Sequence, residues 1–154
     1  MSIEEKREQI LEELRYIDDP YERFSYVIDR GKEHPLLEEK FKNDTFRIDG
    51  CMSQLWVVPE FHDGLCHYRA DSDSSITKGI AALLCDLYSG HSPEEVLRVD
   101  PGFLKEVGIT QHLSPNRRNG LTRVAERIQG FARLYLNNAT EGGDAHEEAA
   151  RARA

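Results

Sequence analysis

Cys51 is the residue of this sequence that is best placed to do chemistry. It stands in the stretch DGCMSQLWVV (residues 49–58), directly after a glycine and just before a run that is typical of a β-strand. Gly50 gives the backbone freedom to turn before the thiol, and loops held by a rigid scaffold are where reactive groups tend to lie. Position alone leaves two interpretations open, a working thiol and an ordinary loop residue.

A second stretch, HLSPNRRNGL (residues 112–121), places two arginines at the start of a predicted helix. Ser114 and Pro115 are residues that commonly begin a helix. Arg117 and Arg118 then fall in the first turn, where the helix dipole disfavours cations. Such a cation forms surface salt bridges, lowers the pKa of a thiol or binds a partner's carboxylate, and the sequence leaves these three roles open.

A third stretch, ADSDSSITKGIAALL (residues 70–84), joins a predicted strand to a strongly apolar helix. Acidic residues before a helix are ordinary capping chemistry. Gly79 lies inside the helical run, where glycine costs about 1 kcal/mol relative to alanine. We therefore expect another segment to approach the helix closely at Gly79.

The remaining candidate groups do not form a known catalytic or metal-binding signature. Cys66 lies in a predicted strand and Cys85 in a predicted helix, where a free cysteine is usually packed in the core. The chain has no CxxC or HxxxH pair, and structural zinc sites usually take their ligands in close pairs; we predict no metal. A cysteine hydrolase would need a histidine such as His67 or His112 beside Cys51, and neither lies in a recognisable motif.

Composition narrows the class of protein. The chain has 154 residues, which fits one domain, and a formal net charge of -8 at pH 7. Nucleic acids and anionic membranes need a basic surface, so we expect neither as a partner. Three cysteines do not make a disulfide framework, and we see neither a signal peptide nor a membrane-spanning run. We expect a cytoplasmic protein with reduced thiols.

Hydrophobic periodicity predicts helices on both sides of a small sheet. An Asp63-Gly64 turn between residues 55–58 and residues 65–70 predicts an antiparallel hairpin, and residues 46–49 are expected to be extended. Helices are predicted over residues 3–17, 20–31, 35–42, 76–87, 101–107 and 115–135, with a further short helix from Pro93. This order predicts an α+β fold with about three antiparallel strands. Residues 1–136 form the predicted domain, and residues 137–154, which are nearly free of large apolar residues, a disordered tail.

Together the three stretches resemble the SufE/CsdE family, the sulfur-acceptor partners of cysteine desulfurases. The resemblance lies in GCMSQLWVV (50–58), ADSDSSITKGIAALL (70–84) and TQHLSPNRRNGL (110–121), and it extends over about residues 5–136. It implies an α+β fold similar to that of SufU/IscU-type iron–sulfur scaffold proteins. It also implies that Cys51 accepts persulfide sulfur from a desulfurase that uses pyridoxal phosphate, stimulates that desulfurase, and passes the sulfur toward iron–sulfur cluster assembly.

The resemblance also implies roles for residues near the acceptor. Asp73 would anchor the loop or the docking face, and Arg117 would contact the partner or steady the sulfur anion. The full set of residues expected to bind the partner or stabilise the loop is Gly50, Ser53, Asp73, Lys78, His112 and Arg117.

The partners implied are a desulfurase of the SufS or CsdA type and a downstream iron–sulfur scaffold, and the chain itself would carry no cofactor besides a transient cysteine persulfide. Two functions remain open. The first is a sulfur carrier rather than an independent enzyme. The second is a stand-alone cysteine enzyme that uses Cys51 with a histidine such as His112.

Overall fold

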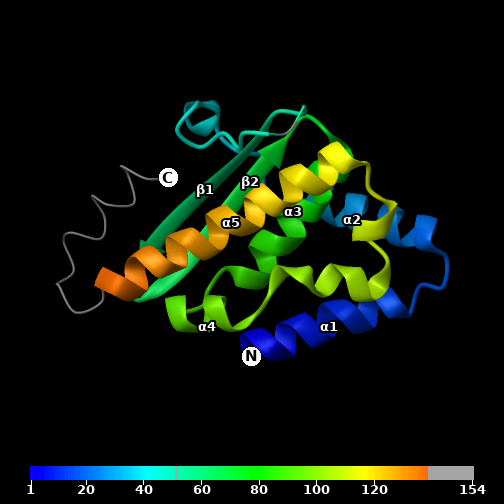
Figure 1. Cartoon of the computed structure of the whole chain (residues 1–154), viewed down its shortest axis with the longest axis horizontal. Helices are drawn as coiled ribbons and strands as arrows, with labels where there is room; N and C mark the ends of the chain where they lie inside the picture. The colour runs from blue at the N-terminus through cyan, green and yellow to red at the C-terminus, as the bar shows by residue number, and fades with distance from the viewer. Residues whose placement is uncertain (51, 139–154) are drawn as a thin grey trace.

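The computed structural model describes residues 1–50 and 52–138. In these residues a β-hairpin is packed with helices, so the predicted α+β class is confirmed (Figure 1). The elements along the chain are α1 (Ile3–Arg15), α2 (Pro20–Glu33), the 3-10 helix η1 (Glu39–Phe41), β1 (Leu55–His62), β2 (Leu65–Ser72), α3 (Ser75–Tyr88), α4 (Pro93–Arg98), the 3-10 helices η2 (Pro101–Val107) and η3 (Thr110–His112), and α5 (Pro115–Asn138).

The hairpin forms as its turn residues predict. Asp63 and Gly64 both have positive φ angles, 56° and 77°, which is the backbone of a tight turn that suits the twist of a hairpin. The strands pair antiparallel from Leu55 opposite Ser72 to His62 opposite Leu65. Alternate residues of β2, including Cys66 and Tyr68, are buried, and this face of the sheet carries the core.

The number of strands was predicted wrongly. We expected about three, but the described residues form a sheet of two strands. Residues 46–49 make a single bridge, Arg47 opposite Trp56, with a hydrogen bond from Ile48 N–H to the Leu55 carbonyl. The backbone N–H groups of Phe46 and Arg47 donate to the Asn43 carbonyl instead, so a turn occupies the residues that would extend the third strand.

The short helix predicted over residues 35–42 is also reduced, to the single 3-10 turn η1. The backbone N–H of Leu37 donates to the carboxylate of Asp71 at 3.2 Å, which ties this segment to the end of β2. Leu37 is buried with Trp56 and Val58 in a small cluster on the other face of the sheet. Burial of this side chain and the bond to Asp71 therefore favour an extended segment here.

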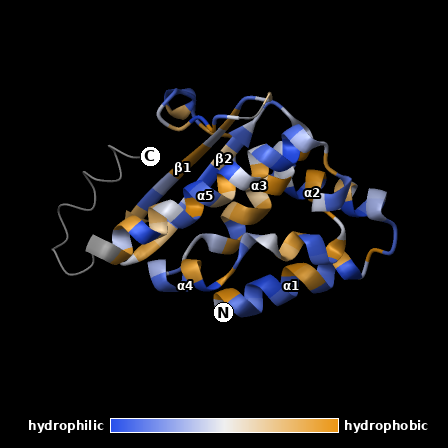
Figure 2. Ribbon diagram, in the orientation of Figure 1, coloured by the Kyte–Doolittle hydropathy of each residue, from blue (hydrophilic) through white to orange (hydrophobic). Residues whose placement is uncertain are grey.

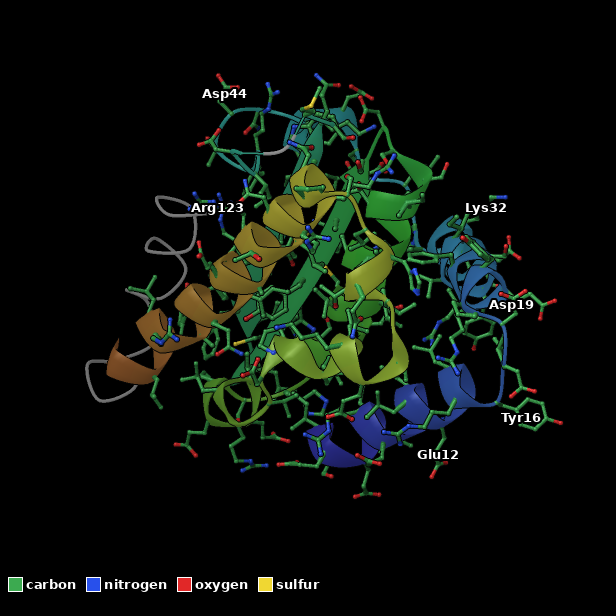
Figure 3. The ribbon with its side chains drawn as sticks, turned by 45° about the vertical axis from the view of Figure 1, so that its right-hand side comes forward. Glu12, Tyr16, Asp19, Lys32, Asp44 and Arg123 are labelled. Atoms are coloured by element: carbon green, nitrogen blue, oxygen red, sulfur yellow. The ribbon has the colours of Figure 1, made fainter. Side chains whose placement is uncertain are left out.

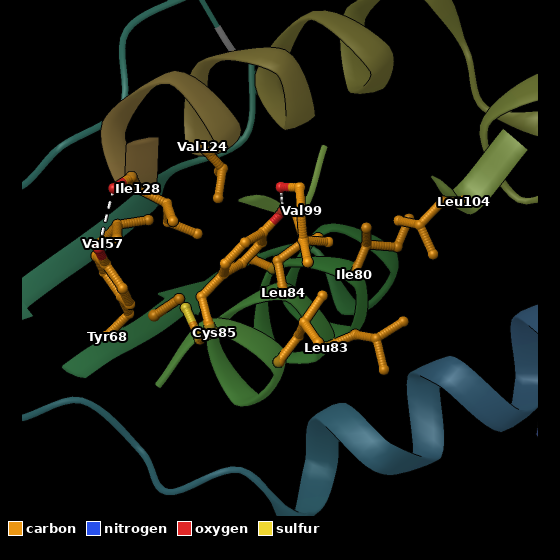
Figure 4. Close-up of a cluster of buried hydrophobic side chains, with 14 of the residues drawn as sticks. Val57, Tyr68, Ile80, Leu83, Leu84, Cys85, Val99, Leu104, Val124 and Ile128 are labelled. Carbon is orange, nitrogen blue, oxygen red and sulfur yellow. Dashed lines mark hydrogen bonds between the residues drawn. The ribbon is translucent and has the colours of Figure 1, made fainter. Parts of the chain in front are cut away.

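The main core lies between the hairpin, α3 and α5. Figure 4 shows α3 residues such as Ile80, Leu84 and Cys85 meeting Val124 and Ile128 of α5. The hydroxyl of Tyr68 donates to the Ile128 carbonyl at 2.9 Å, which ties the sheet to α5. Figure 2 shows hydrophobic residues concentrated on these inner elements and hydrophilic residues on the outer side of α1. Cys66 and Cys85 are both fully buried, as predicted.

The close approach expected at Gly79 is confirmed. A Cβ atom at Gly79 would lie 2.7 Å from the Val27 carbonyl oxygen, and one at Gly31 would lie 2.6 Å from the Gly79 Cα. Helices α2 and α3 therefore pack with their backbones in contact, which only glycine permits. This contact fixes α3, and with it the strand end from which α3 starts.

We expect Gly79→Ala to lower the free energy of unfolding by about 1–3 kcal/mol, because the added methyl group overpacks the α2–α3 contact. Gly130→Ala is the matched control. Nothing lies within 4 Å of a Cβ at Gly130, which is in the middle of α5, so alanine should stabilise the protein there by roughly 0.5–1 kcal/mol. Urea unfolding measures both. A stabilised Gly79→Ala protein would contradict the close packing.

Candidate functional site

Residues on both sides of Cys51 are fixed by side chains that come from distant parts of the chain. Cys51 itself lies outside the described residues. Before it, the Gly50 carbonyl accepts a hydrogen bond of 2.7 Å from the Asn119 Nδ2. After it, the Met52 N–H donates to the Asn116 Oδ1 at 3.0 Å. The start of α5 therefore holds the chain where it enters and where it leaves the predicted acceptor.

Gly50 is required by this geometry. Its φ angle is +83°, a conformation that side-chain-bearing residues rarely adopt. A Cβ atom there would also lie 2.9 Å from the Asn119 Nδ2, and Arg123 closes the same side at 3.6 Å. Figure 3 shows Arg123 projecting outward from α5 at the end of the molecule that also carries Asp44. Gly50 thus serves as a turn residue packed against α5.

The DSD stretch, residues 71–73, holds Gln54, the last residue before β1. The Asp73 Oδ1 accepts a hydrogen bond of 3.0 Å from the Gln54 N–H, and the Asp73 N–H donates back to the Gln54 carbonyl at 3.2 Å. The Ser72 hydroxyl donates to the same carbonyl at 2.7 Å. Three bonds from two residues therefore fix the backbone of Gln54 at the start of β1.

Asp71, the first residue of this stretch, is buried and supports the two residues that follow it. Its side chain is nearly fully buried, and its carboxylate accepts from the backbone N–H groups of Leu37 at 3.2 Å and Ser72 at 2.8 Å. The ammonium groups of Lys42 and Lys78 each lie 3.5 Å from it. Burial alone would raise the pKa of Asp71, but these two hydrogen bonds and two positive charges outweigh it and lower the pKa below its ordinary value.

Arg117 is half-buried in the first turn of α5, near Leu55 at the start of β1. Its side chain lines a small cavity of about 10 Å³ together with Leu55 and Thr77, room for about one water-sized atom. Among the described residues the guanidinium of Arg117 has no hydrogen-bond or ion-pair partner, and the Thr77 hydroxyl is buried without one. A positive charge without a partner among the described residues therefore lies in the first turn of α5, beside the start of β1 at Leu55.

Arg118 has a structural role. Its guanidinium donates to the Leu113 carbonyl at 2.6 Å and so closes the turn between η3 and α5. Ser114 begins α5 by accepting from the Arg117 N–H at 3.3 Å.

The side chains of three predicted site residues make no hydrogen bond to residues 50–54 among the described residues. The ring of His112 packs against Tyr21 and Phe24 of α2, with centroids 6.3 and 6.2 Å apart. Lys78 faces Asp71, and the half-buried side chain of Ser53 makes no hydrogen bond with any described residue. The structure thus brings Gly50, Asp73 and the start of α5 together around residues 50–54. Lys78 supports this arrangement indirectly through Asp71, and His112 packs against α2 instead.

Three residues that contact residues 50–54 directly were not selected from the sequence, namely Ser72, Asn116 and Asn119. Asp71, which supports Ser72 and Asp73 from within the core, was not selected either. Asparagine is unfavourable inside helices because its side chain competes for backbone hydrogen bonds. The presence of Asn119 within the predicted helix could therefore have indicated a role for its side chain. The burial of Asp71 could not be predicted from the sequence, since it depends on how residues 35–38 pack.

The comparisons with known proteins agree with this convergence. A family model for SufE, described as an Fe-S metabolism associated domain, matches residues 8–132. The chain belongs to the SufE family. This membership associates it with iron–sulfur metabolism.

Curated relatives extend the same assignment. The chain is 36% identical over 132 residues to SufE-like protein 1, chloroplastic/mitochondrial, of Arabidopsis thaliana, covering 85% of this chain and 35% of that protein. It is 34% identical over 125 residues to the cysteine desulfuration protein SufE of Plasmodium vivax, covering 79% of this chain and 50% of that one. An uncharacterized SufE-like protein of Rhizobium meliloti (strain 1021) is 31% identical and covers 81% of this chain and 93% of its own length. The chain thus spans about a third of the length of the plant relative and half of the length of the Plasmodium relative.

A solved structure supports the fold. The solution structure of a hypothetical protein from Thermus thermophilus matches with a TM-score of 0.72 and 25% identity, over 86% of this chain and 96% of that one. The described helices of the SufE-family chain include none that is long and apolar enough to cross a membrane. Among its described residues, no group of three or more His, Cys, Asp or Glu side chains could hold a metal ion, and the absence of a metal or cofactor stays a prediction.

We expect Asp71→Asn to lower the free energy of unfolding at pH 7 by about 2–4 kcal/mol, because it removes the charge that Lys42 and Lys78 neutralise. Since the folded pKa is lowered, this stabilisation is complete above the unfolded pKa near 4 and is lost as the pH falls through the folded value. When the free energy of unfolding is measured in urea from pH 3 to 7, it should depend less on pH for the variant than for the native protein.

The control for Asp71→Asn is Glu60→Gln. Glu60 pairs with Arg69 at 2.7 Å on the surface, and such exposed pairs contribute less than about 1 kcal/mol. Equal losses in the two variants would show that Asp71 does not hold the DSD stretch as described.

Proposed function

We propose that Cys51 accepts the terminal sulfur of a persulfide on a cysteine desulfurase and passes it on toward iron–sulfur cluster assembly. In this role the protein is a sulfur carrier that stimulates the desulfurase, and its only covalent cargo is a transient persulfide. Family membership supports the general area of iron–sulfur metabolism. The name of the Plasmodium relative, a cysteine desulfuration protein, supports a desulfurase as the partner.

One observation carries the proposal. The three sequence stretches that resemble the family are far apart in the chain, yet they make contact around residues 50–54. Asn119 and Asn116 reach Gly50 and Met52 across 69 and 64 positions, and Asp73 reaches Gln54 across 19 positions. A fold that uses three separate segments to fix the neighbours of one cysteine is expected where that cysteine does the chemistry.

The proposed step is a thiol–persulfide exchange. The Cys51 thiolate attacks the outer sulfur of the desulfurase persulfide, a new S–S bond forms at Cys51, and the old S–S bond breaks. The desulfurase cysteine leaves as a thiolate, so the exchange needs no external oxidant or reductant. Its rate depends on the thiolate fraction of Cys51, on the leaving thiol and on access.

Neighbouring residues fit supporting roles in this proposal. Arg117 carries an unpartnered positive charge among the described residues and would steady the sulfur anion or contact the desulfurase. Asp73 would keep residue 54 in place between rounds of transfer. The cavity beside Arg117 and Thr77 would shield a sulfur atom from solvent, which matters because a persulfide is easily oxidised.

A stand-alone cysteine enzyme with His112 as the base is the alternative. It is less well supported, because the ring of His112 packs against Tyr21 and Phe24. The described side-chain hydrogen bonds to residues 50–54 come from asparagine, serine and aspartate, and none comes from a histidine.

We also propose the cytoplasm as the site of action, with a SufS- or CsdA-type desulfurase as donor and an iron–sulfur scaffold as recipient. The two other thiols support a reducing compartment, since Cys66 and Cys85 are free and buried. Cofactor chemistry would belong to the desulfurase, through its pyridoxal phosphate.

The direct test mixes the protein with a matching desulfurase and cysteine, then maps sulfur by mass spectrometry of non-reduced peptides. We expect a gain of about 32 Da, one sulfur atom, on the peptide that contains Cys51. Cys66 and Cys85 are internal controls, because burial raises the pKa of Cys66 to about 11 and that of Cys85 further.

Cys51→Ser should abolish the adduct. An adduct that survives this change, or that sits on Cys66, would refute the proposed acceptor. Hydrolysis or another turnover by the protein without a desulfurase would instead favour the stand-alone enzyme.

We expect Arg117→Ala to slow sulfur transfer to Cys51 by roughly tenfold or more, the effect of losing one charge-assisted contact. Arg117→Lys should recover part of the rate. The melting temperature should hardly change, since the guanidinium makes no bond within the described residues. Arg133→Ala on the exposed face of α5 is the matched control. Equal rates for the Arg117→Ala and Arg133→Ala proteins would remove Arg117 from the mechanism.

A further inference from the structure

Asn116 and Asn119 lie in the first two turns of α5, and both direct their amides away from their own helix. The helix already has an N-cap, since the Ser114 hydroxyl accepts from the Arg117 N–H. Asparagines near a helix start usually serve the helix itself. Here each amide bonds instead to a backbone group that neighbours Cys51.

We propose that Asn116 and Asn119 are positioning residues that set where the sulfur acceptor stands relative to α5. This inference rests on the proposed function of Cys51. The two asparagines are not proposed to touch the transferred sulfur. They hold Met52 and Gly50, so that the residue between these two is presented from a fixed backbone.

The two amides play opposite hydrogen-bond roles. The partner of Asn116 is the Met52 N–H, a donor, so Asn116 must accept through its Oδ1. The partner of Asn119 is the Gly50 carbonyl, an acceptor, so Asn119 must donate through its Nδ2. The chemistry of the partners thus fixes which way each amide points.

Gly50 completes the arrangement from the other side. Its φ angle of +83° accompanies the bond from its carbonyl to Asn119, and the space beside its Cα is filled by the Asn119 amide. A side chain at position 50 would displace that amide. Gly50 and Asn119 therefore act as one unit, and the role of Gly50 is a fixed turn rather than free rotation.

The opposite roles give a sharp test, because aspartate is an acceptor only. Asn116→Asp keeps the bond to the Met52 N–H and adds charge to it. Asn119→Asp loses the bond and sets a carboxylate against the Gly50 carbonyl. Neither aspartate is disfavoured by the dipole of α5, whose effect is stronger at position 116 in the first turn than at position 119 in the second. A purely structural role in the helix therefore predicts the same benign result for both variants.

Two measurements on the isolated protein follow the bonds. The first is the hydrogen-exchange rate of the Met52 amide, and the second is the carbonyl carbon chemical shift of Gly50. We expect Asn116→Ala to speed Met52 exchange roughly three- to tenfold, the ratio that corresponds to one net hydrogen bond. Asn116→Asp should leave it at or below the native rate. Asn119→Ala and Asn119→Asp should both shift the Gly50 signal.

The functional readout is the iodoacetamide alkylation rate of Cys51, followed peptide by peptide. The rates are measured over a range of pH and compared for the thiolate form, because the new carboxylate of an aspartate raises the pKa of a nearby thiol. On that scale we expect a change of threefold or more, roughly that of one hydrogen bond, in Asn116→Ala, Asn119→Ala and Asn119→Asp, and none in Asn116→Asp. Asn43→Ala is the matched control. Asn43 also makes two amide hydrogen bonds, to Lys40 and Thr45, in a different loop. Melting temperatures of all variants confirm that each one is folded.

The inference is overturned if Asn116→Asp behaves like Asn116→Ala, or if Asn119→Asp matches the native protein. These outcomes are separate from a failure of the proposed function. If the unchanged protein gains no sulfur on Cys51 from the desulfurase, the proposed function fails, whatever the exchange rates show. If sulfur transfer is normal and the asparagine variants equal the control, only the positioning role is wrong.

Discussion

The site depends on the hydrogen bonds and ion pairs of one buried carboxylate, that of Asp71. It binds the 35–38 segment through Leu37 and lies within 3.5 Å of Lys42 and Lys78. A buried charge is stable only when such partners are complete. Because Asp71 is fixed in this way at the next-to-last position of β2, Ser72 and Asp73 follow in positions from which they hold Gln54.

A second constraint comes from the opposite side, through α5. The Tyr68 hydroxyl and the buried residues Val124 and Ile128 fix α5 on the hairpin, so its first two turns stand at a set place relative to the start of β1. The asparagines there reach Gly50 and Met52. The neighbours of the acceptor are thus held between sheet and helix, by hydrogen bonds to backbone atoms rather than by burial. Such bonds are individually weak, which suits a segment that must deliver its thiol to another protein.

Local patterns predicted well what local chemistry decides. The Asp63-Gly64 turn, the burial of Cys66 and Cys85, and the close approach at Gly79 all follow from residue type and periodicity. The failures have one cause. The 35–42 helix and the third strand were lost to long-range or turn hydrogen bonds at Leu37 and Phe46, which periodicity does not register. Asn119 stood out locally as a residue that is unfavourable inside a helix, but the contacts of Asn116 and Asn119 could not be predicted, because their partners lie more than sixty positions away.

The central claim is that sulfur passes directly from a desulfurase cysteine to Cys51. A single-turnover experiment tests it, in which desulfurase preloaded with persulfide is mixed with the protein, quenched at short times and analysed peptide by peptide. We predict that the persulfide on the desulfurase disappears at the rate at which it appears on Cys51, with no sulfide released first. Free sulfide that forms before any sulfur reaches Cys51 would contradict direct transfer.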